Sequence, residues 1–89
     1  MAKEKRINIE YLTSKGFIPF KEEDNVISYH RSKDGLIVAF EHHNQATHHI
    51  EICTDWWILM IKGTNLLLQC ECNTMVKYEQ IMEAFGLKA

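Results

Sequence analysis

The chain has 89 residues, of which 46% are hydrophobic and 25% charged, and its net charge is -2 at pH 7. This composition is typical of one globular domain, residues 1–89, and argues against a disordered chain. The slightly acidic balance provides no basic patch for nucleic acid or for an anionic membrane. Because the chain has three cysteines and no apolar leader or membrane-length apolar run, we expect a cytoplasmic protein with reduced thiols.

The first predicted element is a short helix that begins after Asn8, a favourable N-cap residue. Gly16 provides the left-handed residue that ends the helix, and Phe17 can then fold back onto Leu12. Pro19 excludes a further helical turn and predicts an extended segment.

A hairpin is expected next, around a turn at residues 32–35. The spacing of apolar residues changes to two over residues 26–30, and Leu36, Val38 and Phe40 then share one face of a strand. The Asp-Gly pair inside the turn readily adopts the positive φ angles that tight hairpins need.

The following strand is predicted at His48–Cys53, beside the strand that contains Phe40. The favoured register pairs Glu41 with His49, which places Phe40 opposite Ile50. A slip of one residue would put a charged side chain opposite Phe40 instead, so the apolar faces select this register.

The last part of the chain predicts two strands and a helix. Trp56–Ile61 is apolar on both faces, a turn follows, and residues 66–70 return as the next strand. A helix capped by Asn73 or Thr74 then ends at Gly86. Its expected core stripe is Tyr78, Ile81, Met82 and Phe85. The predicted fold class is α+β, an antiparallel sheet of four to six strands flanked by an N-terminal and a C-terminal helix.

Two segments carry a resemblance, Leu12-Thr13-Ser14-Lys15-Gly16-Phe17 and Ile81-Met82-Glu83-Ala84-Phe85-Gly86-Leu87. In these segments and in its outline the chain resembles the small uncharacterised α-β-meander-α proteins of phages and mobile elements. The resemblance implies an accessory or host-interaction protein and no catalytic residues. The outline also resembles the double-stranded-RNA-binding fold, but residues 74–77 supply a single lysine where that fold clusters several, which argues against RNA.

Four of the five histidines lie in one stretch, residues 42–49. In the favoured register His42 and His48 are cross-strand neighbours with Cβ atoms about 4.5–5.5 Å apart. Two such imidazoles could chelate Zn²⁺, Ni²⁺ or Cu²⁺. The alternative is an exposed hairpin tip that is rich in histidine and binds no metal.

The cysteines provide weaker evidence for a site. Cys70 and Cys72 share one face of a strand, but structural zinc sites prefer a Cys-x₂-Cys loop and a second pair, so we expect free thiols that act as small hydrophobic residues. Cys53, His49 and Asp55 alternate along one predicted strand, but the sequence offers no oxyanion donor beside them. We therefore predict that the protein is not an enzyme.

Trp56 and Trp57 are the main candidates for function. Adjacent strand residues point to opposite faces, so one tryptophan faces the helices and the other does not. If both helices cover the same face, an apolar row is left on the other, and such rows mark interfaces. The predicted partner-binding residues are Trp56, Trp57, Ile58 and Met60.

The leading functional hypothesis is a non-catalytic interaction protein, a homodimer through the sheet face or edge or the binder of a protein partner. The alternative is a small metal-binding module that uses the histidine stretch.

Overall fold

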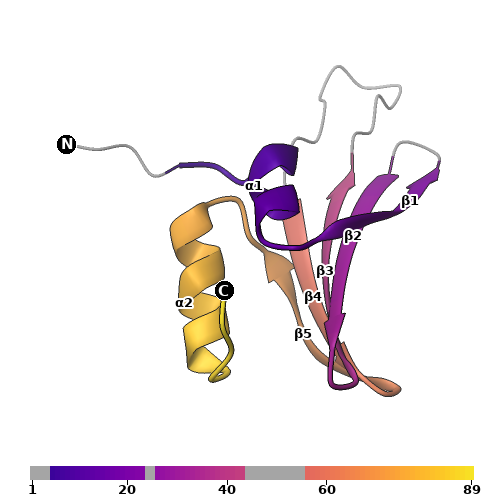
Figure 1. Cartoon of the computed structure of the whole chain (residues 1–89), viewed down its shortest axis with the longest axis vertical. Helices are drawn as coiled ribbons and strands as arrows, with labels where there is room; N and C mark the ends of the chain where they lie inside the picture. Colours follow the sequence, from indigo (N-terminus) through magenta and orange to yellow (C-terminus); the bar gives the residue numbers. More distant parts are fainter. Residues whose placement is uncertain (1–4, 24–25, 44–55) are drawn as a thin grey trace.

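The computed structural model describes residues 5–23, 26–43 and 56–89. In chain order its elements are α1 (Ile9–Ser14), β1 (Ile18–Glu23), β2 (Val26–Lys33), β3 (Leu36–His43), β4 (Trp56–Lys62), β5 (Asn65–Glu71) and α2 (Met75–Ala84). The five strands form one antiparallel meander in the order β1-β2-β3-β4-β5, as Figure 1 shows. This confirms the predicted α+β class. Within the described ranges, neither helix is long and apolar enough to cross a membrane.

Local signals set both ends of α1. The Asn8 side chain accepts a hydrogen bond from the Tyr11 amide at 2.7 Å, as an N-cap should. Gly16 has a φ of +89°, and the Phe17 amide donates back to the Leu12 carbonyl at 3.0 Å. This is the predicted Schellman ending, and it brings Phe17 into the core beside Leu12.

The same motif ends α2. Thr74 caps its first turn by accepting from the Lys77 amide, and the Leu87 amide donates to the Met82 carbonyl at 2.8 Å beyond Gly86. Leu87 therefore packs against the core just after the helix.

Both tight turns of the described sheet contain residues with positive φ. Asp34 and Gly35 have φ angles of 53° and 79°, the pattern of a type I′ hairpin turn. Gly63, between β4 and β5, has a φ of 61°. The Asp-Gly turn predicted at residues 32–35 is therefore confirmed.

The predicted partner of β3 is wrong. Phe40 lies between Tyr29 of β2 and Ile58 of β4, so both edges of its strand are occupied. Neither neighbour is Ile50, which lies with the predicted strand at 48–53 outside the described residues. Trp56, Ile58 and Met60 form an alternating apolar row that suits the face of Phe40 as well as Ile50 and Ile52 would, and this row is longer.

Both helices pack on the same face of the sheet. Leu12 of α1 and Tyr78 and Met82 of α2 join one buried cluster. The strand residues of this cluster alternate along their strands and lie opposite one another in the register, as do Tyr29, Phe40 and Ile58. The cluster consists of Ile7, Leu12, Phe17, Tyr29, Val38, Phe40, Trp56, Ile58, Met60, Cys72, Tyr78 and Met82.

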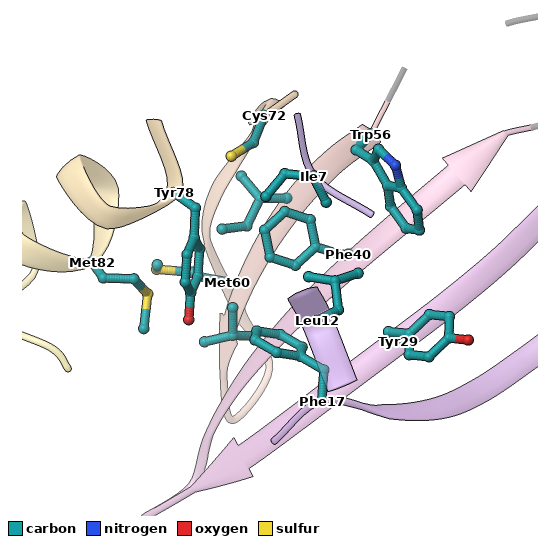
Figure 2. Packing of buried hydrophobic residues seen from close by; sticks show 12 residues of the cluster. Ile7, Leu12, Phe17, Tyr29, Phe40, Trp56, Met60, Cys72, Tyr78 and Met82 are labelled. Carbon is teal, nitrogen blue, oxygen red and sulfur yellow. The ribbon is translucent and has the colours of Figure 1, made fainter. Parts of the chain in front are cut away.

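Aromatic rings form the centre of this core (Figure 2). The Phe40 ring meets Phe17 at 5.3 Å and Tyr78 at 5.4 Å between centroids, both edge to face. Trp56 lies beside Phe40 at 6.3 Å. Such edge-to-face pairs each add about 0.5–1.5 kcal/mol beyond the burial of their area. Phe40 thus connects β3 to Phe17, which follows α1, and to Tyr78 of α2.

The predicted core stripe of α2 needs one correction. Tyr78 and Met82 are buried and Ile81 is partly buried, but Phe85 is 44% exposed. Phe85 is the C-cap residue, where the backbone leaves the helix. The Schellman turn brings Leu87 back to the core instead. The helical spacing therefore predicted one buried residue, Phe85, beyond those that α2 buries.

Arg31 connects three separate segments on the helix side of the sheet. Its guanidinium donates to the Lys15 carbonyl at 2.7 Å, to the Tyr78 hydroxyl at 2.9 Å and to the Lys88 carbonyl at 3.1 Å. Its Cζ also lies 4.7 Å from the centre of the Phe17 ring. One side chain thereby ties the end of α1, the middle of α2 and the C-terminal tail to β2.

Two tyrosines in this region differ in one respect. Tyr78 is fully buried and accepts the Arg31 hydrogen bond, whereas the buried Tyr11 hydroxyl has no hydrogen-bond partner among the described residues. Burial raises the pKa of both hydroxyls, and Arg31 partly offsets this for Tyr78.

We expect the same chemical change to have different effects at these two positions. Tyr78→Phe should lower the free energy of unfolding by about 1–3 kcal/mol, because Arg31 loses an acceptor. Tyr11→Phe should leave it unchanged or raise it by up to about 1 kcal/mol, because an unsatisfied hydroxyl is removed. Urea denaturation of the two variants measures both, and equal destabilisation would contradict the assignment.

Candidate interaction surface

The face of the sheet opposite the helices is the candidate site. We call it the open face, because neither described helix packs on it. Its residues follow from the register, since residues paired across strands share a face. The open face carries Ser28, His30, Ile37, Ala39, Glu41, Trp57, Leu59, Ile61, Leu66, Gln69 and Glu71.

The centre of the open face is apolar. Trp57, Leu59 and Ile61 alternate along β4 with the buried row of the same strand, and all three are half-buried. Ile37 lies opposite Ile61, and Ala39 lies opposite Leu59. Ile37, Trp57, Leu59 and Ile61 form the accessible apolar band on the two middle strands, and Ala39 between them is only 3% exposed.

Exposed apolar side chains extend the band toward both edges. On β1, Ile18 lies opposite His30 and is 64% exposed, and Phe20 is 66% exposed. On β5, Leu66 lies opposite Ile61 and is 54% exposed. Four of the five strands therefore carry apolar side chains on the open face, whereas β2 contributes the polar residues Ser28 and His30.

Phe20 owes its place to an irregularity in β1. The register shifts between Pro19 and Lys21, so Phe20 is left without a direct partner on β2. Its ring stacks on His30 with centroids 4.0 Å apart and an interplanar angle of 8°. The bulge thus positions an aromatic ring flat on the open face.

A serine–histidine pair lies beneath this ring. The Ser28 hydroxyl and His30 Nε2 are hydrogen-bonded at 2.9 Å. The pair resembles a nucleophile with its base, but Ser28 is only 4% exposed, so a substrate could not reach the hydroxyl. The arrangement fixes the imidazole and, through it, the Phe20 ring.

Carboxylates mark one end of the open face. Glu41 of β3 and Glu71 of β5 lie on either side of Trp57 across the strands. Trp57 therefore has an acidic neighbour on each side, while Leu59 and Ile61 have none in the register. The face divides into an acidic end near Trp57 and an apolar end near Ile61.

The structure changes the set of predicted partner-binding residues. Trp56, Ile58 and Met60 belong to the core row of β4 and are at most 7% exposed, so a partner cannot reach them. Trp57 is the one predicted residue that lies on the open face. Leu59 and Ile61 take the places of Ile58 and Met60, because the strand turns its odd residues outward.

The histidine stretch is only partly described. His48 lies outside the described residues, and the strand positions opposite His42 are occupied by Ile27 and Trp56. The His42 ring contacts the Trp56 ring at 4.8 Å. Neither strand beside His42 is therefore the one predicted to carry His48, and a metal site formed by His42 and His48 stays a prediction. Among the described residues no three His, Cys, Asp or Glu side chains come together as a metal site.

Cys70 and Cys72 are free thiols, as predicted, the first half-buried and the second fully buried. Burial raises the pKa of Cys72 to about 12, so this thiol stays protonated at neutral pH. Cys53, His49 and Asp55 lie outside the described residues.

Comparison of the chain with protein-family models, with curated proteins and with solved structures finds no significant match. The site must therefore be judged on its own geometry.

Sequence reasoning missed Phe20, His30, Leu59 and Ile61 as surface residues. For β4 the alternation separates two apolar rows, but the sequence pattern does not show which row faces the helices. For Phe20 there was none, because the bulge that turns it onto His30 is a property of strand pairing.

His30 predicts a pH dependence of stability. Burial lowers its pKa, and the nearby Glu41 opposes this without cancelling it. The unfolded chain, with a histidine pKa near about 6.5, then takes up the proton first as the pH falls. Stability should be lost as the pH drops below about 6.5, until the folded-state pKa is passed.

Thermal unfolding between pH 7.5 and pH 5 checks this expectation. His30→Gln keeps a polar group beside Ser28 but does not titrate, so the variant should show a smaller fall in Tm over that range. An unchanged fall would exclude His30 as its source.

Proposed function

We propose that this protein is a non-catalytic interaction protein that forms a homodimer through its open face. One observation carries the proposal: both helices cover one face of the sheet, which leaves the apolar band on the other. Bands of this kind mark interaction surfaces in soluble proteins. Self-association is also a common source of stability for chains of this size.

The dimensions of the open face fit a modest interface. Five strands about 4.8 Å apart, with about 3.4 Å per residue over the seven residues of β4, span roughly 19 Å between the outer strand axes by roughly 24 Å along the strands. The product of these two lengths, roughly 460 Å², is below the roughly 800 Å² that each partner buries in a standard interface. Interfaces at the small end of the range are typical of transient complexes, so we expect a dimer that dissociates at micromolar concentrations.

The distribution of charge favours one arrangement of two copies. A twofold axis that runs between the sheets, across the strands near Leu59, would place apolar side chains together at the centre. It would also bring the acidic end of one copy over the opposite end of the other. The Glu41 and Glu71 carboxylates of the two copies would then stay apart.

Two further expectations belong to this proposal. A cytoplasmic location agrees with the reduced thiols expected from the sequence. The accessory or host-interaction role implied by the resemblance to phage and mobile-element proteins would be one setting for such a dimer.

The test is the mass in solution. At tens of micromolar, sedimentation equilibrium should give twice the 10.5 kDa of the chain. Leu59→Glu places a charge at the centre of the open face and should give the monomer mass, because burying an unpaired carboxylate is costly.

Val76→Glu is the matched control. Val76 is an exposed apolar residue on the first turn of α2, away from the open face, and a carboxylate is tolerated there. This variant should dimerise like the parent. A monomer mass for the parent protein across the concentration range would refute the proposal.

A further inference from the structure

A groove lies on the helix side of the sheet, away from the open face. It is bounded by the β2–β3 turn, by β4 and β5, and by the end of α2 with the tail that follows. In Figure 1 the β2–β3 turn, the β4–β5 turn and the C-terminal end of α2 lie at the same end of the molecule. The groove has a volume of about 800 Å³, within the range of roughly 300–1,000 Å³ that is usual for small-molecule sites.

The walls of the groove are apolar. Val38 and Met82, both buried, form its base, and the side chains along it are Leu36, Leu67, Phe85 and Leu87. Leu67 and Phe85 are 45% and 44% exposed. Leu67 has no direct partner on β4, because the register shifts there, and Phe85 is the residue that α2 does not bury. Both side chains line the groove.

The rim is positively charged. Arg31, Lys33, Lys62 and Lys88 line the groove, whereas Asp34 is its one acidic side chain. The chain as a whole has a net charge of -2. An excess of cationic side chains around an apolar groove therefore stands out against an acidic protein and favours an anionic ligand.

Arg31 supplies the more specific argument. It is half-buried, yet the three groups that accept its hydrogen bonds are two backbone carbonyls and a phenol, all uncharged. No described carboxylate side chain forms an ion pair with it. A guanidinium has five N–H donors, so two are left beyond these three bonds. Both Nη2 hydrogens are already donated, so the two free hydrogens, on Nε and Nη1, do not share one edge of the guanidinium. A carboxylate oxygen can accept one charge-assisted hydrogen bond there and supply the negative charge that no described carboxylate side chain provides.

We propose that this groove binds a small amphiphile with a carboxylate head and an unbranched alkyl chain. The head lies at Arg31 and the basic rim, and the alkyl chain lies along Leu36, Leu67 and Phe85. The proposal is independent of the dimer, because none of these residues belongs to the open face.

Decanoate is the probe, measured by isothermal titration calorimetry below its micelle threshold. We expect saturable binding of one molecule per chain. Decanol, which lacks the charge, should bind at least about tenfold more weakly, and octanoate, two methylenes shorter, also about tenfold more weakly. Decyl phosphate tests the head group, and binding more than about tenfold tighter than decanoate would overturn the carboxylate assignment.

A matched pair of variants locates the site. Leu67→Glu puts a carboxylate on the exposed wall of the groove and should reduce decanoate affinity at least about tenfold. Val76→Glu makes the same kind of change at an exposed apolar residue that lines neither the groove nor the open face, and it should bind like the parent. Circular dichroism of both variants verifies their fold. No saturable binding to the parent, equal binding of decanol, or full affinity in Leu67→Glu would each refute the proposal.

Discussion

The main constraint on this structure is the small size of its two described helices relative to the five-stranded sheet on which they pack. α1 has six residues and α2 has ten, so at about 1.5 Å per residue they measure roughly 9 Å and 15 Å. A five-stranded sheet, about 19 Å between its outer strand axes, needs both helices on one face to enclose a core. Phe40, at the centre, contacts rings from the α1 side and from α2. The opposite face is left with half-buried aliphatic side chains, and the interaction proposal follows from this arrangement.

Local features of the fold were predictable from the sequence because their causes lie within a few residues. Asn8 caps the helix that follows it, and Gly16 ends that helix because it adopts a positive φ. The Asp34-Gly35 turn is equally local. The neighbour of β3 was not predictable in this way. Residues 50–52 and Ile58 both offer apolar alternation, and the sequence pattern contains no measure of which segment pairs with Phe40.

The candidate sites show the same division between local and long-range causes. Alternation placed Trp56 and Trp57 on opposite faces, but only the position of the helices decided that Trp56 is in the core. Phe85 fits the helical period, yet the Schellman turn gives its place to Leu87. Arg31 gave no signal at all, because a single basic residue on a strand looks like an ordinary exposed one. Its three acceptors come from segments that are distant in sequence.

Backbone hydrogen bonds also join the N-terminal segment to the start of α2. Arg6 and Thr74 form an antiparallel bridge, the Ile7 amide donates to the Asn73 carbonyl, and the Met75 amide donates to the Lys5 carbonyl. These contacts join residues that are 66 to 70 positions apart in the sequence, so they close a long loop and raise the contact order of the fold. During synthesis, Ile7 must wait for α2 to leave the ribosome before it can enter the core. The N-terminal segment is therefore expected to dock in one of the last steps of folding.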